Sequence, residues 1–385
     1  MFDYKIVNGQ IFDAEKGEFF ESNLYVKDSI IAEISSADHE AKQVIDAYGK
    51  LVCPGLVDEH LHLDYQGSII GVNGDTVCIP SGVTTACDGG TCGVSNFPLF
   101  YRSNIVRYEA STFAYLNVST FGNKSLCIHE EDHDPKDFRF DLILKCFEQY
   151  GSTIRGLKVR MCQGTLGDKL GMEPLLATLD MSEKLISRGY RCPVAVHYDN
   201  LPDNVKVSDL FGAMRKGDVV AHVFQNKRET IFNEDFSIKQ SVLEAKERGV
   251  IMDDCHGRVH WTIKHLQSAF AQGFFPDVIS SDAVRISEYV RPGFSLVYAL
   301  NMDIACGMPL KQALQAVTIN PARVLGLDKV GILREGGIAD IAILDNMQLK
   351  TTLADNYGDS LEVENLLVPL LTMKSGRVAF RQIYF

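Results

Sequence analysis

Hydrophobic and polar positions in the middle of the chain follow a repeating order. From residue 51 to about residue 330, short apolar runs alternate with longer stretches of helical pattern. Short apolar strands that alternate with helices are typical of repeated βα units, whose strands pair in parallel. We therefore expect a parallel sheet covered by helices. Its candidate strands include residues 156–160, 193–197, 218–222, 250–253 and 277–282.

The two ends of the chain have a different pattern. The first 50 residues contain short strands separated by turn residues, which predicts β-hairpins. Asn8-Gly9 and Asp28-Ser29 are typical of the turns that join two antiparallel strands. The expected hairpin strands are residues 4–7 with 10–12, and residues 23–27 with 30–34. Strand-like sequence returns at residues 339–344 and 366–369.

These patterns predict an α/β chain with two domains. Residues 51–330 are expected to form a (β/α)8 TIM-like barrel, because a chain of 385 residues is long enough for such a barrel and a small appended domain. Residues 1–50 and 331–385 are expected to form that small domain, a β-sandwich built from both termini. The barrel would then be one continuous insert.

Composition and charge exclude several classes of protein. A hydrophobic content of 46% and a charged content of 23% are ordinary for a globular enzyme. A net charge of -12 without any basic block argues against a nucleic-acid or anionic-membrane partner. We find no apolar run of ~18 residues and no signal-peptide pattern. The ten cysteines are scattered without CxxC pairs, which favours free thiols in a cytoplasmic protein.

The segment Asp58–His62 carries the first candidate chemistry. His60 and His62 lie one residue apart at the end of an apolar strand. Side chains two residues apart on a strand point to the same face, so both imidazoles can reach one metal ion. A histidine pair of this kind is more often a core or surface pair than a metal site. The argument therefore depends on the other strand ends.

Further metal-competent residues lie on or near the carboxyl ends of the predicted strands, where the active sites of (β/α)8 barrels are built. These residues are Lys158, His197, His222 and Asp282. Each one alone also fits a structural role. A single histidine can be a hydrogen-bonded core residue, Asp282 can cap a helix, and Lys158 can face solvent beside Arg160. Several such residues at the strand ends of one barrel favour a metal site.

The chain resembles the amidohydrolase superfamily of metal-dependent hydrolases. The motifs that carry the resemblance span nearly the whole chain. They are Pro54–His62, Ser81–Thr85, Lys158, His197, His222, Asp282, Asn320–Arg323 and Gly336–Ile341. Within the superfamily, residues 71–78 and 88–97 resemble a deacetylase branch that is often labelled dihydroorotase-like or adenine-deaminase-like.

The resemblance implies a binuclear metal site, commonly of zinc. Its ligands would be His60, His62 and Asp282 for one ion, and His197 and His222 for the other. Lys158 would bridge the ions as a CO2-derived carbamate, because two cations repel and an ammonium between them has the wrong sign. A hydroxide that bridges the metals would attack the substrate carbonyl, and Asp282 would transfer the proton to the leaving group.

The substrate is predicted from weaker signals. Dihydroorotases carry a carboxylate-binding Arg where this chain has Asp64, which argues against a cyclic-ureide substrate. The residues placed to bind a substrate carboxylate are Arg160, His256 and Arg258, with Arg285 as a further candidate. Each also fits a surface or supporting role.

We therefore expect an enzyme that deacylates a small N-acyl or O-acyl amino or hydroxy acid. The alternatives are a cyclic amide hydrolase of dihydroorotase type, a purine deaminase, and a noncatalytic scaffold. The expected partner is a small acidic molecule, with no nucleic acid and no membrane. We also expect the chain to form a homo-oligomer.

Overall fold

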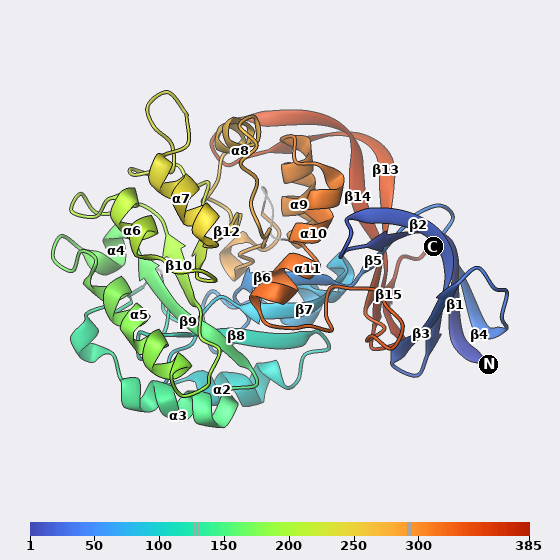
Figure 1. The fold of residues 1–385 in the computed structure, drawn as a ribbon, viewed down its shortest axis with the longest axis horizontal. Coiled ribbons are helices and arrows are strands. Elements are labelled where there is room, and N and C mark those ends of the chain that lie inside the picture. Colours follow the sequence, from blue (N-terminus) through green and yellow to red (C-terminus); the bar gives the residue numbers. More distant parts are fainter. Residues whose placement is uncertain (127, 130, 291–294) are drawn as a thin grey trace.

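The computed structural model describes residues 1–126, 128–129, 131–290 and 295–385, and it contains two large sheets (Figure 1). The first sheet has seven strands in the order β12-β11-β10-β9-β8-β7-β6, all paired in parallel. Its strands are β6 (Leu56–Leu61), β7 (Val83–Asp88), β8 (Ser111–Asn117), β9 (Ile154–Met161), β10 (Val194–Tyr198), β11 (Val219–Ala221) and β12 (Ile251–Asp253). This sheet confirms the predicted TIM-like architecture.

The predicted strand at 277–282 is wrong as a strand, but the segment occupies the eighth position of the barrel. Asp254 N donates to Val278 O (3.0 Å) on one side, and Asp282 N donates to His60 O (2.7 Å) on the other. A φ of 45° at Asp282 turns the backbone out of the extended conformation. The segment therefore closes the barrel between β12 and β6 with irregular backbone.

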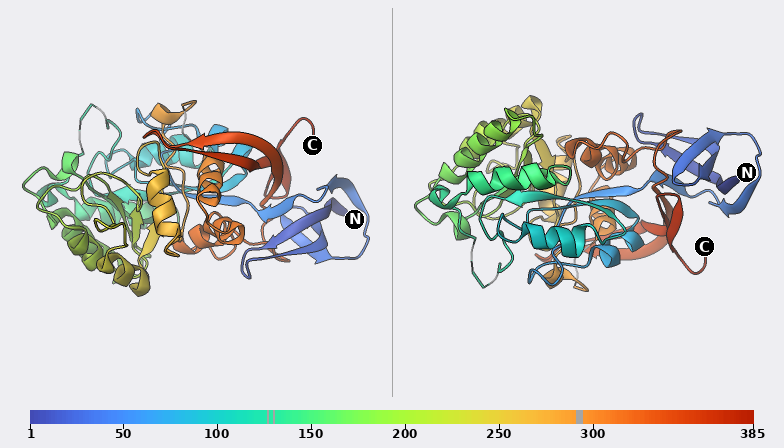
Figure 2. Two further views of the ribbon diagram at one scale, coloured as in Figure 1. Left: turned by 90° about the horizontal axis from the view of Figure 1, so that it is seen from above. Right: turned by 90° about the horizontal axis from the view of Figure 1, so that it is seen from below.

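Helices cover the outside of the parallel sheet (Figures 1 and 2). In α3, residues Ile143, Cys146, Phe147 and Tyr150 are buried, which is the spacing of one helix face. The longer helices are α3 (Phe140–Tyr150), α5 (Glu173–Ile186), α6 (Val207–Ala213), α7 (Gln240–Arg248), α8 (Ile263–Phe270), α9 (Leu296–Ala305), α10 (Leu310–Ala316) and α11 (Ile319–Val324). Short turns of helix are α1 (Gly74–Val77), α2 (Phe97–Phe100), α4 (Gln163–Leu166), η1 (Ile79–Ser81), η2 (Tyr101–Ile105), η3 (Pro135–Asp137) and η4 (Arg285–Ser287). In the part of the chain that the structure describes, none of the helices has the length and apolar character needed to span a membrane.

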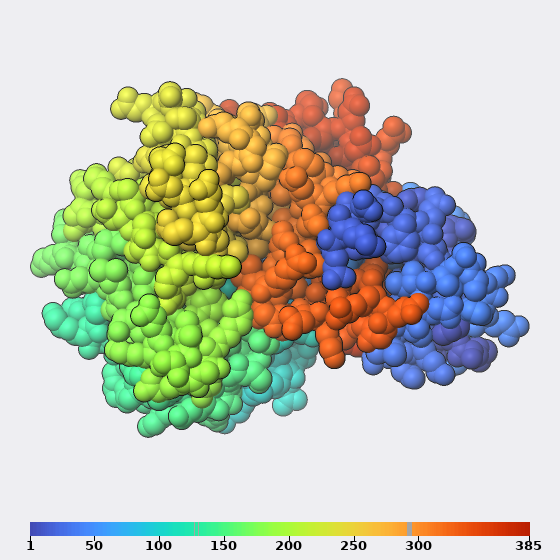
Figure 3. Space-filling model, in the orientation of Figure 1, coloured from blue at the N-terminus to red at the C-terminus, as the bar shows by residue number. Residues whose placement is uncertain are grey.

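The second sheet joins the two ends of the chain, as the sequence predicted, and it is one mixed sheet where a β-sandwich was expected. Its order is β15-β14-β13-β5-β1-β2-β3, and β4 pairs with β1. The strands are β1 (Phe2–Asp13), β2 (Glu18–Lys27), β3 (Ile30–Ser35), β4 (Ala41–Asp46), β5 (Leu51–Pro54), β13 (Ile341–Ala354), β14 (Ser360–Lys374) and β15 (Arg377–Arg381). Figure 3 shows the N-terminal strands, in blue, at one end of the molecule beside the orange segment that includes α10. Between these two parts of the chain, Gln315 Nε2 in α10 donates to Ala14 O (2.9 Å).

One of the two predicted hairpins forms. The turn at Asp28, with φ 54°, joins β2 to β3. The turn predicted at Asn8-Gly9 is wrong, because β1 continues through it with a register shift against β2. Asn8 has a φ of 54°, and a Cβ on Gly9 would lie 2.4 Å from a methyl carbon of Val52. The two residues therefore form a bulge where β1 passes close to β5.

The hairpin formed by β13 and β14 extends from the second sheet across to α8 (Figure 1). At its tip, Asp355 Oδ2 accepts from the backbone N–H of Ile263 (3.1 Å), the first residue of α8. The Tyr357 hydroxyl donates to Val259 O (2.7 Å) in the preceding loop. The terminal sheet thus contributes contacts to a loop of the barrel.

Candidate metal centre

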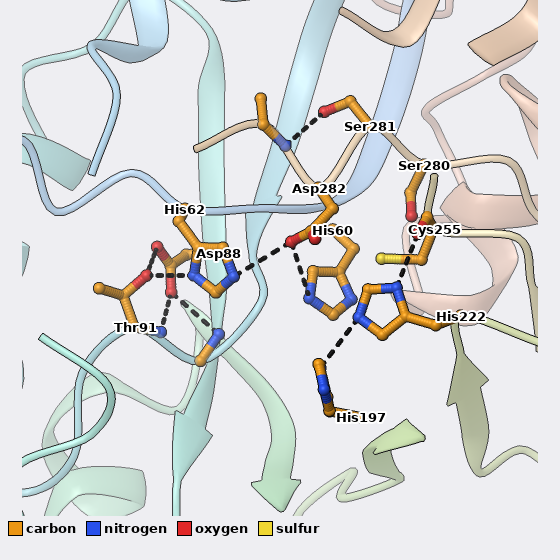
Figure 4. A network of polar contacts seen from close by, with 12 residues as sticks. His60, His62, Asp88, Thr91, His197, His222, Cys255, Ser280, Ser281 and Asp282 are labelled. Carbon is orange, nitrogen blue, oxygen red and sulfur yellow. Dashed lines mark hydrogen bonds and ion pairs between the residues drawn. The ribbon is translucent and has the colours of Figure 1, made fainter. Parts of the chain in front are cut away.

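The six strand-end residues that the sequence singled out lie together at the carboxyl ends of the strands. Each is buried, with at most 7% of its surface exposed. Three contacts join them in pairs: His60 Nε2 to Lys158 Nζ (3.1 Å), His62 Nε2 to Asp282 Oδ1 (3.3 Å), and His222 Nε2 to His197 Nδ1 (2.9 Å). The imidazoles of His60 and His222 lie 5.8 Å apart between ring centroids, and His60 Nε2 lies 3.9 Å from Asp282 Oδ1, so the pairs form one cluster. Figure 4 labels five of the six residues, all except Lys158.

The neighbours of His62 in Figure 4 indicate which of its two ring nitrogens carries the proton in the neutral ring. The Thr91 hydroxyl lies 2.7 Å from Asp88 Oδ2 and 2.7 Å from His62 Nδ1. An ionised carboxylate only accepts, so the hydroxyl donates its one proton to Asp88 and accepts from His62 Nδ1–H. The Nε2 of a neutral His62 then carries a lone pair and faces the Asp282 carboxylate.

His222 has the same tautomer for a similar reason. Its Nδ1 lies 2.7 Å from the carbonyl oxygen of Cys255, which can only accept a hydrogen bond. The lone pair of His222 is therefore on Nε2, which can accept from Nδ1–H of His197. Nε2 of His197 is then also a lone-pair nitrogen, and it is buried without a hydrogen-bond partner among the described residues.

The donor set fits divalent metal ions. A lone-pair nitrogen that faces a carboxylate oxygen at 3.3 Å is repulsive unless a proton or a cation lies between them. His60, His62 and Asp282 offer ligand atoms that all lie within 4.8 Å of one another. Imidazole and carboxylate together are the ligands that zinc and similar ions bind. These buried groups are compatible with metal binding.

Burial also disfavours positive charge on the nitrogen donors. It lowers the pKa of Lys158 below its usual range. Burial, together with the Lys158 charge, holds the pKa of His60 well below its usual value. Metal ligands must be deprotonated, so both shifts favour the binding form of these side chains.

Two of the three residues predicted to bind substrate are engaged within the protein. Arg160 Nη1 forms an ion pair with the buried Glu131 Oε1 (3.0 Å). His256 Nε2 lies 2.6 Å from Asp254 Oδ2 and 3.0 Å from Asp303 Oδ1.

Arg258 differs from the other two. It forms no hydrogen bond or ion pair with another described residue, and its Nε is buried. The further candidate, Arg285, lies over the Tyr65 ring, 4.9 Å from its centroid. Arg258 is therefore the candidate whose guanidinium lacks a partner among the described residues.

Sequence reasoning missed several polar residues around the cluster. Asp88 is the last residue of β7, Thr91 follows it by three residues, and Asp199 follows His197 by two, so strand ends and period-two spacing could have indicated them. His260 lies in the loop after β12, with its ring centroid 4.1 Å from that of His222. No periodic pattern indicates a loop residue of this kind.

Comparisons with known proteins find a family model, relatives in sequence and solved structures that are similar to this chain. The model of the amidohydrolase family matches residues 237–379. A deacetylase from Agrobacterium fabrum is 29% identical over 327 residues, which is 85% of this chain and 78% of the relative. A deacetylase from Enterococcus faecalis is 25% identical over 380 residues, 98% of this chain and 99% of the relative. The crystal structure of an adenine deaminase aligns with a TM-score of 0.90 and 24% identity, covering 99% of this chain and 100% of that one.

Proposed function

The chain belongs to the amidohydrolase superfamily, and on that premise we propose that it is a metal-dependent hydrolase that deacylates a small N-acyl or O-acyl amino or hydroxy acid. The observation that carries the proposal is the buried cluster in which Nε2 of His60 and Nε2 of His62 converge on the carboxylate of Asp282, at 3.9 and 3.3 Å from its Oδ1. The similarity of the chain to deacetylases over most of its length supports the acyl substrate.

We propose two divalent ions, most simply zinc, in this cluster. One would be held by His60, His62 and Asp282, and the other by His197 and His222. Lys158 Nζ lies 3.1 Å from His60 Nε2, one of the proposed ligands of the first ion. A carbamate on Lys158 would supply the anion that two neighbouring cations need. Bound ions would supply Lewis acidity, which polarises an acyl carbonyl and lowers the pKa of water.

Asp282 is the proposed general base and acid. Its Oδ1 is close to His62, and the backbone of Gly257 passes so near its Oδ2 that a Cβ on residue 257 would lie 2.5 Å away. Oδ1 is therefore a candidate ligand atom, and the backbone at Gly257 limits the movement of Oδ2. Asp282 would accept a proton from the attacking water and return it to the leaving amine or alcohol.

Arg258 is the proposed partner of the substrate carboxylate. The Arg258 guanidinium has no partner among the described residues and can form a bidentate contact with a carboxylate, whereas the Arg160 guanidinium is already paired with Glu131. Asp64 is buried and accepts a hydrogen bond from Cys92 Sγ (3.3 Å). It is acidic, so it cannot provide the positive charge that binds the substrate carboxylate at this position in dihydroorotases. A small acidic substrate fits this arrangement.

A product screen tests the proposal. Metal-loaded protein is incubated with acetylated amino and hydroxy acids, cyclic amides and purines, and free acid, ring opening and ammonia are measured separately. We expect release of acetate or another short acid. Ammonia from purines without deacylation would identify a purine deaminase instead. Ring opening of cyclic amides without deacylation would identify a cyclic amide hydrolase.

The arginine assignment has its own test in the same screen. Arg258→Ala should raise KM by about 10-fold or more, since a hydrogen bond to a charged group contributes ~1.5–3 kcal/mol. Arg139→Ala is a matched control, because Arg139 is exposed and pairs with Asp141 at the start of α3. An unchanged KM in Arg258→Ala would remove Arg258 from substrate binding. Assembly as a homo-oligomer and a cytoplasmic location stay predictions.

A further inference from the structure

His260 lies over the metal cluster but is not one of its six strand-end residues. Its ring is 4.1 Å from the His222 ring and 5.3 Å from the His197 ring, between centroids. One of its nitrogens lies within 4.8 Å of ligand atoms of His222 and Asp282. Its side chain is 16% exposed, compared with 2% for His60. His260 is thus on the side of the cluster that is open to solvent.

A carboxylate lies beside the His260 ring. Nδ1 of His260 lies 3.5 Å from Oδ2 of Asp199. The same oxygen is 3.1 Å from Lys227 Nζ, which contributes a positive charge on the other side of the carboxylate. The 3.5 Å between His260 and Asp199 is an ion-pair distance without hydrogen-bond geometry, because His260 Nδ1 has no hydrogen-bond partner among the described residues. A carboxylate on this side of the ring leaves the other nitrogen for a different partner.

The backbone that carries His260 is held in place from the other sheet. The Tyr357 hydroxyl at the tip of the β13–β14 hairpin donates to Val259 O (2.7 Å). On the other side, Gly257 has a φ of +53°, and a Cβ there would lie 2.5 Å from Asp282 Oδ2 and 3.1 Å from His260 Cδ2. The loop therefore passes tightly against Asp282, with His260 in a defined position.

We propose that His260 contacts the bound acyl substrate, and that Asp199 is the residue that positions its ring. The inference rests on the proposed function and deepens it. His260 has the features that such a contact needs: a nitrogen near the candidate metal ligands, partial exposure, a carboxylate beside the ring and an anchored loop. The nitrogen directed to the centre would form a hydrogen bond with a polar atom of the substrate.

The test uses three variants of the full-length, zinc-loaded protein: His260→Ala, Asp199→Asn and His39→Ala. His39 is a control because it is an exposed histidine beside a carboxylate, 3.1 Å from Glu33, in the loop between β3 and β4. For each variant we would measure bound zinc, kcat and KM for the best acetylated acid of the screen, and the affinity for acetohydroxamate. Acetohydroxamate is an acetate analogue whose binding does not require turnover.

We expect His260→Ala to keep its zinc and to lose about 10- to 100-fold in kcat/KM and in acetohydroxamate affinity. Asp199→Asn should show smaller losses of kcat/KM and of acetohydroxamate affinity, and His39→Ala should show neither loss. If His260→Ala loses zinc, the residue is a metal ligand and the inference is wrong. Wild-type kinetics and acetohydroxamate affinity in His260→Ala would also overturn it. If no acylated acid is hydrolysed, the proposed function fails, while weaker acetohydroxamate binding by His260→Ala would still support the contact.

Discussion

Replacing Thr91 by Val should weaken metal binding although Thr91 is not a proposed ligand. The Thr91 hydroxyl accepts from His62 Nδ1 and donates to Asp88, each at 2.7 Å, and all three side chains are buried. Valine has nearly the same shape but cannot form either hydrogen bond. His62 then loses the partner that keeps its proton on Nδ1 and its lone pair on Nε2, towards Asp282.

The expected loss of zinc affinity in Thr91→Val follows from two free-energy costs of similar size. Removing the group that orients a metal-binding histidine typically costs 10- to 100-fold in metal affinity, about 1.4–2.7 kcal/mol. An unsatisfied buried donor costs ~1–3 kcal/mol, which is the same range. We therefore expect the dissociation constant for Zn2+ to rise by about 10- to 100-fold in Thr91→Val.

The assay is a titration of metal-free protein with Zn2+ against a competing chelator. Thr91→Ser retains the hydroxyl and should bind almost as well as the wild type. Thr85→Val is the matched control, because Thr85 is a buried threonine whose hydroxyl has no hydrogen-bond partner among the described residues. Equal zinc affinity for Thr91→Val and Thr85→Val would refute the argument from the tautomer of His62.

Three other variants test separate parts of the account. Asp282→Asn should keep much of its metal and lose kcat by orders of magnitude, because an amide cannot transfer the proton; near-normal kcat would exclude that role. Lys158→Ala should lose both metal and activity, since the proposed bridge disappears, and full metal content by elemental analysis would contradict it. His256→Ala should lower the free energy of unfolding by ~3–5 kcal/mol, because two buried carboxylates lose their cation. Burial opposes the charge on His256, but Asp254 and Asp303 outweigh burial and raise its pKa to about 10. The stability from this imidazolium should be full below about pH 6.5 and decline towards pH 10, and urea unfolding of His256→Ala should lack that slope.

Local rules predicted the strand-end part of the site. His60 and His62 share a face because strand side chains alternate, and the carboxyl ends of parallel strands meet at one edge. These two rules were enough to bring together residues separated by more than 200 positions, such as His60 and Asp282. The irregular backbone at Asp282 was not predicted, because its hydrogen bonds to β6 depend on barrel closure.

Residues outside the strands could not be found in the same way. His260 is placed by a loop that Tyr357 holds from a hairpin about 100 positions further along the chain. The bulge at Asn8 depends on the approach of Val52, which hairpin statistics for an Asn-Gly pair do not include. Contacts between distant segments decide both features, and a reading of local sequence does not contain them.

The most direct test of the central claim is a titration of metal-free protein with Zn2+ during which acetate release from an acetylated amino or hydroxy acid is measured. The account predicts no release without metal and a rise to a plateau at about two ions per chain. Acetate release by the metal-free protein, or a metal-loaded protein that releases none from any acetylated acid, would contradict it.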